Sequence, residues 1–510
     1  MVLYQNQQKE KPVFFNYQIR KILNSITKTN KITNKRLLAF IVLTFCFLKT
    51  AFSQEINYYN PNQTKALFSI LDLDFSKSRQ QHHYPIALDF QLKSLGVFLE
   101  TILNCNKEEY LLGKVHEVKW QDSLSRTPDC PEKLFAKSQI KLHWAILSYM
   151  YGDRVNAAFK MRQVYTILHE NYKKYPNHKP TQLYFGFMNI YLAEIPDSFQ
   201  WLTDLIGLNG NAELGQKLIE SSKSNHPVLE LERQLLTIEK KSQFEDQEEN
   251  ATKIVEKILT EKGFHPTTKA ITALYFVKNK NAAKANVILN ELEYDKYPLF
   301  HYIKGLTAFH MLDFKTASSY FKTFNKRNLS ENFKKDVALH LAYISYLEGD
   351  SVQAKKLLAS IHHKGNDALF ADKKANRLST EKLPDKNILM SRIAFDGGNW
   401  LESRNWLIKW KAYTEEDKAE FYYRLARIEQ KMNNVEYSKK CYKSSIGYSH
   451  NHSHYYGPFS CLYLADIYIK ESNKNLAKHY YDTSNVYTDF EHKATYAKKH
   501  KELKKHLDSK

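Results

Sequence analysis

The chain has 510 residues, of which only 15 are Gly and 13 are Pro. This low share argues against a β-rich fold with many tight turns, and it excludes collagen-like or Gly/Pro-rich disordered chains. Hydrophobic residues make up 43% and aromatic residues 14%, which excludes a mostly disordered chain. At this length we expect about three domains or one long array.

The net charge is large, but it does not by itself identify the class of partner. The 75 basic and 55 acidic residues give a formal net charge of +20, which favours nucleic acid, anionic membrane surfaces or acidic partners. AT-rich codons offer a second explanation, because Lys, Asn, Ile, Tyr and Phe are abundant while Gly and Pro are sparse. Since no Arg-rich stripe, zinc pattern or RNA-binding signature is present, a nucleic-acid partner is not expected.

Residues 1–53 are predicted to be a secretory signal peptide with an extended basic n-region. The pair Lys35-Arg36 precedes the apolar run LLAFIVLTFCFL, and Ala51 and Ser53 mark a cleavage site after Ser53. The run is shorter than the roughly 20 residues that a spanning helix needs. We therefore expect export to the periplasm, cell envelope or medium, with peripheral membrane association as an option. The long basic stretch leaves an uncleaved anchor, a transit peptide and a cytoplasmic location as alternatives.

The five cysteines contain no CxxC pair, which argues against a zinc ribbon or a thioredoxin-like site. Cys46 lies in the predicted signal peptide. The other four form two local pairs, so disulfides Cys105–Cys130 and Cys441–Cys461 are expected in an oxidising compartment. Buried free thiols are an equally weighted alternative.

Residues 54–132 are predicted to form a helical cap or degenerate repeats. The stretches TKALFSILDLDF and LDFQLKSLGVFLETIL have the spacing of helices, with polar segments between them.

From residue 133 the chain repeats a helix-turn-helix unit. In the clearest copy, residues 301–324, small Gly305 is followed twelve residues later by Ala317 and four residues after that by Phe321. Two antiparallel helices approach closely where each carries a small residue, and the large residue fills the gap to the next pair. The same spacing recurs at Ala145/Ala157, Ala273/Ala285/Leu289, Ala342/Ala354/Leu358, Ser391/Ser403/Leu407, Ala426/Ser438/Tyr442 and Ala465/Ala477/Tyr481. One pair cannot bury its apolar face alone, so the pairs are expected to stack.

These residues resemble the tetratricopeptide repeat over about residues 133–490. The resemblance implies an all-α fold, a right-handed α-solenoid of stacked antiparallel helix pairs. Along the chain we expect repeats over 133–262, including a divergent Gly/Pro segment, and again over 263–363. An irregular loop over 364–386, further repeats over 387–490 and a basic capping helix over 491–510 follow.

The divergent segment, residues 183–219, resembles the tetratricopeptide-repeat-39 and inclusion-body-clearance type family. The matching residues are Gly186, Pro196, Gly207, Gly210 and Gly215. That family is helical and intracellular and carries no attached enzymatic activity, so the resemblance implies architecture alone.

Chemistry-bearing motifs are weak. His450, His452 and His454 alternate in HNHSHYY, a spacing that suits zinc or copper, although a solvated polar loop is the favoured interpretation. No GxSxG, HExxH, phosphate-binding loop or dinucleotide fingerprint is present. We expect no catalytic residue, no metal, no cofactor and no enzymatic activity.

The predicted function is a scaffold that binds a protein or peptide along the inner side of the solenoid. Aromatic and Arg anchors are typical of such grooves, and the repeat register places Tyr302, Phe309, Tyr343, Tyr346, Tyr423 and Arg427 there. Packing between repeats is the other role open to these side chains. The alternative functions are a polysaccharide-handling component of an exported complex and a basic nucleic-acid-binding repeat protein. The pattern names neither the partner nor the oligomeric state.

Overall fold

The computed structural model describes residues 59–76, 86–194, 207–243, 248–260, 265–292, 295–449 and 454–508. Within these ranges the regular structure is helical, and an isolated bridge between Asn106 and Leu329 is the only β-type pairing. The predicted all-α class is therefore confirmed. None of the described helices is both long and apolar enough to cross a membrane. The predicted signal peptide lies outside the described residues.

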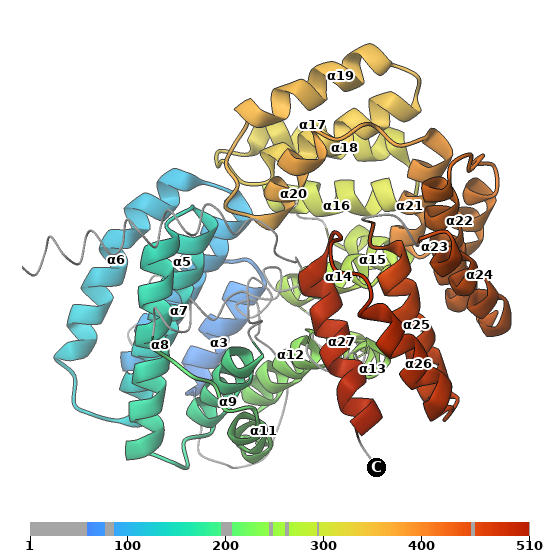
Figure 1. Cartoon of the computed structure of the whole chain (residues 1–510). Coiled ribbons are helices and arrows are strands. Elements are labelled where there is room, and N and C mark those ends of the chain that lie inside the picture. Colours follow the sequence, from blue (N-terminus) through green and yellow to red (C-terminus); the bar gives the residue numbers. More distant parts are fainter. Residues whose placement is uncertain are drawn as a thin grey trace, which may run out of the picture. The chain divides into compact units, whose positions relative to one another are not determined.

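The described residues divide into two units, whose helices Figure 1 labels. The larger unit comprises the described residues of 59–412 and 424–438, and the smaller unit comprises those of 413–423 and 439–508. The helices of the larger unit are α3 (Pro61–Leu71), α5 (Ile86–Asn104), α6 (Lys107–Ser125), α7 (Pro131–Met150), α8 (Arg154–Lys174), α9 (Lys179–Ala193), α11 (Ala212–Ser221), α12 (Pro227–Gln243), α13 (Glu248–Thr260), α14 (Pro266–Lys278), α15 (Ala282–Asn290), α16 (Pro298–His310), α17 (Phe314–Arg327), α18 (Lys334–Leu347), α19 (Ser351–Ser360), the 3-10 turn Ile361–His363, α20 (Phe370–Leu378), α21 (Lys386–Gly397) and α22 (Trp400–Leu407).

Successive helices of the larger unit pack as pairs, and the pairs stack on one another. The pairs are α7 with α8, α9 with α11, α12 with α13, α14 with α15, α16 with α17, α18 with α19, and α21 with α22. Contacts of α5 with α7, α8 with α9, α15 with α16 and α17 with α18 link one pair to the next. This arrangement confirms the predicted stack of helix pairs.

The predicted small residues lie at the helix crossings. A Cβ added to Gly305 would come within 2.7 Å of the Phe321 ring, so only glycine fits beneath it. Ala317 and the equivalent alanines are buried. Where serine replaces alanine, its hydroxyl is paired: Ser438 Oγ donates to the carbonyl oxygen of Ala426 at 2.8 Å. A buried hydroxyl without such a partner would be destabilising.

One turn type recurs between paired helices. A residue with positive φ, such as Leu312 (65°) or Gly349 (99°), is followed by an Asp or Asn N-cap. Asp313 accepts a hydrogen bond from the Thr316 N–H at 3.1 Å, and Asp350 accepts one from Gln353 at 2.9 Å. These caps satisfy amide groups that the second helix leaves unpaired and fix where it begins.

The divergent glycine segment forms a close crossing between α9 and α11. An added Cβ on Gly215 would lie 2.6 Å from the Gly186 carbonyl oxygen, and one on Gly186 would lie 2.8 Å from that of Gly215. Gly210 fits equally tightly against the backbone of α9. The backbones of α9 and α11 therefore touch directly. Pro196, part of the same predicted motif, lies outside the described residues.

The prediction of an irregular loop over 364–386 is wrong in its middle part. Residues Phe370–Leu378 form α20, which packs against α18. The segment is too polar to be recognised from hydrophobic periodicity, because α20 buries only Asp372 and Ala375.

The smaller unit ends in the predicted capping helix. Its elements include α25 (Tyr456–Lys470), α26 (Lys474–Ser484) and α27 (Lys493–Asp508), while α23 (Glu415–Lys431) and α24 (Val435–Gly447) contribute residues to both units. Leu503 of α27 packs against Leu462, Ala465 and Tyr481 of the α25–α26 pair. Lys501, Lys504 and Lys505 are exposed. The last helix thus covers the apolar side of the final pair and presents lysines to solvent.

Candidate protein-binding surface

Three of the six predicted groove residues are core residues. Tyr302, Phe309 and Tyr423 are 6%, 3% and 3% exposed. The Tyr302 hydroxyl donates to Asp336 Oδ2 at 2.8 Å, and its ring lies 4.3 Å from that of Phe333. Tyr423 packs among tyrosines of the smaller unit. Packing between helices, the alternative role, is what the structure shows for these three.

The other three are half-buried and have internal partners. Tyr343 packs against the apolar cluster of α18 and its neighbours. The Tyr346 hydroxyl donates to the Pro384 carbonyl oxygen at 3.1 Å, and Lys386 lies over its ring. The Arg427 guanidinium lies 4.7 Å from the centre of the Phe395 ring. The structure does not gather the six residues into one open groove.

Four first helices of the repeats are covered on nearly all sides. Apart from Lys179 at the N-terminus of α9, no residue of α7, α9, α16 or α18 is exposed. Helix α16 packs against α5 and α21 as well as against α17. Spacing alone did not reveal this, because a helix covered on several sides shows the same apolar and aromatic residues as a helix that lines a groove.

Helix α3 covers part of this side of the larger unit. It packs against α5 and α14. Gln63 Nε2 donates to Asp89 of α5 at 3.0 Å, and the Thr267 hydroxyl of α14 donates to the Leu71 carbonyl oxygen at 2.9 Å. His265 bonds to Asp72. Helix α3 therefore covers part of α14, the first helix of the α14–α15 pair.

The largest group of exposed apolar side chains on one helix lies on α6, among the described residues. Leu111, Leu112, Val115 and Val118 are 50%, 72%, 55% and 68% exposed. Their spacing of one, three and four residues places them along one side of the helix. We call these four residues the α6 face. Large contiguous apolar patches are rare on monomeric soluble proteins, and such patches mark interaction sites.

The opposite side of α6 is firmly anchored. Gly113 packs beneath the Trp144 ring, which an added Cβ would approach to 2.4 Å. Buried Glu117 pairs with Lys160 of α8 and lies 3.5 Å from Lys141 of α7. Burial lowers the pKa of Lys160, with Glu117 opposing the shift. Helix α6 lies alongside α5 and α7 (Figure 1). Its exposed face is thus held in place by the fold.

The α6 face was not predicted, although a signal for it exists in the sequence. Within KEEYLLGKVHEVKWQDSLS, apolar residues follow two helical rows: Tyr110, Gly113 and Leu124 on the buried side, and the α6 face on the other. From sequence alone, two apolar rows predict a helix that is covered on both sides. The structure shows that the first row is buried and that the second row is exposed.

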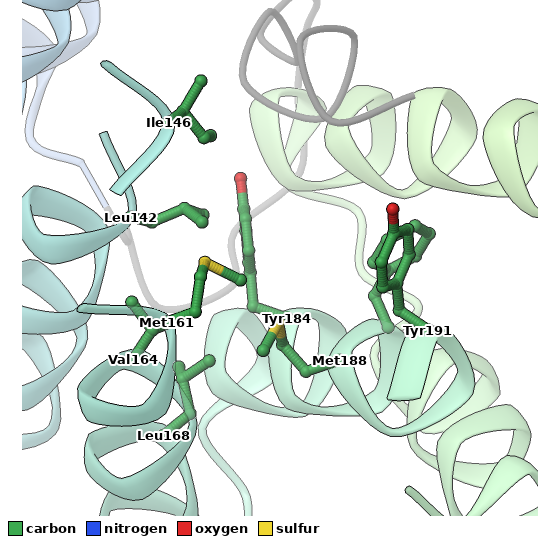
Figure 2. A pocket seen from close by; sticks show the side chains of 9 residues that line it. Leu142, Ile146, Met161, Val164, Leu168, Tyr184, Met188 and Tyr191 are labelled. Carbon is green, nitrogen blue, oxygen red and sulfur yellow. The ribbon is translucent and has the colours of Figure 1, made fainter. Parts of the chain in front are cut away.

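An apolar pocket lies between α7, α8 and α9 (Figure 2). Its space of about 370 Å³ includes the open mouth, and Figure 2 shows Met161, Tyr184 and Met188 around it. On neighbouring α12, burial raises the pKa of Glu232 well above its ordinary value. A hydrogen bond with the Tyr184 phenol acts in the opposite direction and lowers this pKa. The lining offers contacts to an apolar group but no nucleophile and no set of metal ligands.

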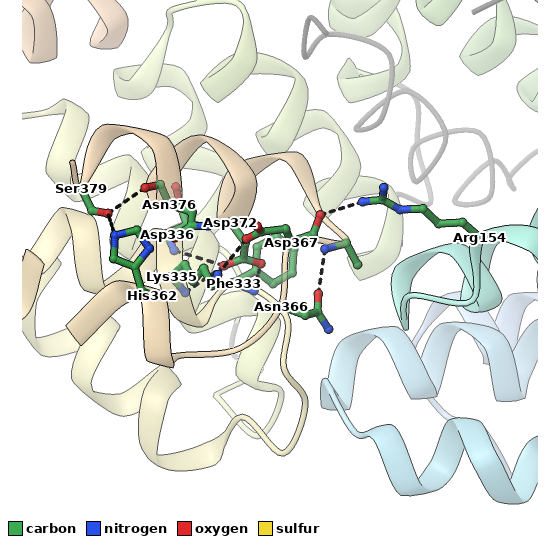
Figure 3. A network of polar contacts seen from close by, with 11 residues as sticks. Arg154, Phe333, Lys335, Asp336, His362, Asn366, Asp367, Asp372, Asn376 and Ser379 are labelled. Carbon is green, nitrogen blue, oxygen red and sulfur yellow. Dashed lines mark hydrogen bonds and ion pairs between the residues drawn. The ribbon is translucent and has the colours of Figure 1, made fainter. Parts of the chain in front are cut away.

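A polar network joins α18 to α20 (Figure 3). The buried Asp372 carboxylate accepts backbone hydrogen bonds from Phe333 at 2.6 Å, Lys335 at 2.9 Å and Asp336 at 3.2 Å. Burial and the Asp336 carboxylate raise the pKa of Asp372 to about 7, although the backbone donors oppose the shift. Phe333, the N-cap of α18, has a positive φ of 62° and contributes no side-chain cap. Asp372 therefore acts as the cap of α18, a structural role.

The structure also places most of the residues of the predicted disulfides and of the predicted histidine cluster. Cys105, Cys130, Cys441 and Cys461 are all free thiols, so the disulfide expectation is wrong. The alternative of buried free thiols holds for Cys105, Cys441 and Cys461, whereas Cys130 is half-buried. His450 and His452 lie outside the described residues, while His454 pairs with Glu416 at 2.8 Å. Across the described ranges, no three His, Cys, Asp or Glu side chains are placed to hold a metal ion.

Comparisons with known proteins give distant structural similarities. No family model matches the chain, and no curated protein matches it. The human IFIT1 dimer with m7Gppp-AAAA is 15% identical with a TM-score of 0.34, covering 89% of this chain and 95% of that one. The APC/C hetero-tetramer Cut9-Hcn1 is 13% identical with a TM-score of 0.24, covering 88% and 97%. These similarities assign no ligand or partner to this chain. The chain's own paired small residues and capped turns describe a tetratricopeptide-like helical repeat, whereas no family model supports the narrower resemblance of residues 183–219.

Proposed function

We propose that this protein is a non-enzymatic helical-repeat scaffold that binds protein through the α6 face. The observation that carries the proposal is the exposure of four large apolar side chains on one anchored helix. A second helix can cover such a row by packing against anchor residues that are spaced three, four and seven positions apart. Leu111, Val115 and Val118 have this spacing.

The proposal replaces the groove predicted from the repeats. Tyr302, Phe309 and Tyr423 are packed inside, and apart from Lys179 at the start of α9 the first helices α7, α9, α16 and α18 have no exposed residue. The same burial removes these tyrosines as stacking platforms for sugar rings, so no observation favours the polysaccharide alternative. The α6 face is apolar, which does not suit a phosphate backbone.

Site-specific photo-crosslinking in the native cells tests the proposal. A photoreactive residue at Leu112 is expected to form an adduct with a protein that mass spectrometry identifies, and Val115→Glu on the same chain is expected to remove the adduct. Val352 of α19 is the matched control, since it is 81% exposed and is not on α6. Absence of any protein adduct at Leu112, or an equal yield at Val352, would contradict the proposal.

Export belongs to the same proposal. It rests on the sequence pattern of residues 1–53, with cleavage after Ser53. N-terminal sequencing of the mature protein tests it: a chain that begins at Gln54 in an exported fraction supports export, and an intact N-terminus in the cytosol contradicts it.

A further inference from the structure

We infer that the occupant of the α6 face is the α6 face of a second copy of this chain, packed antiparallel across a two-fold axis. This inference rests on the proposed function and names its partner. It is drawn from the order of charges along α6, which is self-complementary under that symmetry.

Glu108 and Lys119 carry the argument. Eleven residues separate them, which is close to three turns of 3.6 residues, so they lie on the same flank of the helix. Both are exposed, and neither takes part in an ion pair among the described residues. Leu112 and Val115 lie between them in the sequence, on the exposed side.

A two-fold axis perpendicular to α6 brings each end of one helix to the opposite end of the other. The midpoint of Leu111 and Val118 then lies on the axis, and the midpoint of Glu108 and Lys119 lies about 1.5 Å from it along the helix. Each Glu108 thus faces Lys119 of the other copy, while Leu111 faces Val118. The contact closes, because the symmetry forms the Glu108–Lys119 charge pair twice.

The outer residues agree with this register. Lys107 and Asp122 are exposed, and their midpoint coincides with that of Leu111 and Val118. Antiparallel packing therefore brings Lys107 near Asp122 of the other copy, although Asp122 also pairs with Arg126 of its own helix at 2.5 Å. A parallel arrangement would place Glu108 against Glu108 and Lys119 against Lys119, which is repulsive.

Charge reversal tests this pairing specifically. Two copies of the full chain with different tags are co-expressed, one is captured, and the other is quantified. Glu108→Lys on both copies, or Lys119→Glu on both, reverses two contacts each, and we expect about tenfold less co-purification. When one copy carries Glu108→Lys and the other Lys119→Glu, every contact is again between opposite charges, and wild-type recovery is expected.

Two further variants keep the result interpretable. Val115→Glu on both copies places two carboxylates near the axis and is expected to lower co-purification at least tenfold, whereas Val352→Glu is expected to leave it unchanged. Far-UV circular dichroism checks that each variant is folded. The inference is overturned if wild-type copies do not co-purify, or if the mixed charge pair recovers no better than either reversed pair. If copies do not co-purify but Val115→Glu still abolishes the photo-adduct at Leu112 with another protein, the inference fails and the proposed function stands.

Discussion

Replacing Gly215 with Ala tests whether direct backbone contact holds α9 and α11 together. The new Cβ would lie 2.6 Å from the Gly186 carbonyl oxygen, 2.6 Å from Ile190 Cγ1 and 3.0 Å from Ile190 N. Two of these atoms belong to the backbone of α9, so no side-chain rotation relieves the overlap. Since carbon-to-carbonyl contacts occur at about 3.3 Å and above, the helices must separate by about 0.7 Å.

The expected cost follows from two opposing effects. Overpacking a tight site destabilises by about 1–3 kcal/mol, and backbone overlap places this site toward the upper end. Ala favours a helix over Gly by about 1 kcal/mol. The net loss is therefore about 1–2 kcal/mol. Gly447, at the exposed end of α24, is the matched control: an added Cβ meets nothing within 4 Å, so Gly447→Ala is expected to be neutral or to stabilise by up to about 1 kcal/mol.

Hydrogen–deuterium exchange measures this locally, which suits a chain with two units. Peptides that cover 183–193 and 212–221 are expected to exchange about tenfold faster in Gly215→Ala, since about 1.4 kcal/mol corresponds to a factor of ten. Peptides of α25 and α26 serve as the internal reference. Unchanged or slower exchange in α9 and α11 would refute the close crossing.

Three further predictions concern buried groups. Burial lowers the pKa of His143 to about 3, so the stability that its neutral form provides is present above pH 6.5 and is lost as the pH falls. Between pH 7.5 and 5.5 this amounts to about 1.4 kcal/mol, and urea unfolding of His143→Leu should lack that component. Asp372→Ala leaves three buried amides without their acceptor and should cost about 1–3 kcal/mol, seen as faster exchange at the start of α18; unchanged exchange there would argue against the cap. Maleimide should label half-buried Cys130 in the folded protein but Cys105, Cys441 and Cys461 only after unfolding, and a pair that resists alkylation without reductant would reveal a disulfide.

The repeat architecture was predictable because its signal is local and redundant. A small residue, a turn and a second small residue twelve positions later recur in seven copies, and each requirement is steric. Gly305 under Phe321 and Ser438 bonded to Ala426 are what such a crossing demands. The capping helix was predicted from another local signal, the helical spacing of the apolar residues in TYAKKHKELKKHLDSK.

Contacts of a repeat helix with elements outside its own pair and its neighbouring pairs were not predictable. Whether Tyr302 lines a groove or fills a core depends on Phe333 and Asp336, more than thirty residues away. Helix α20 was not predicted because its sequence has no apolar periodicity. It is attached to α18 through Asp372, which accepts backbone hydrogen bonds from that helix's N-terminus. Cysteine spacing likewise carries no information about whether two thiols meet.

The charges on α6 distinguish a helix that binds a partner from a core helix whose apolar side is simply left unpacked. The helix macrodipole accounts for an acid near the N-terminus such as Glu108, but it does not account for Lys119, which lies before the last turn and has no ion-pair partner within the described residues. An uncovered core row also gives no reason for opposite charges three turns apart on one flank. A patch that binds through apolar contact alone would respond to Val115→Glu but would be indifferent to which copy carries Lys at position 108 and which carries Glu at position 119. Recovery of the mixed charge pair therefore demonstrates register and direction as well as adhesion.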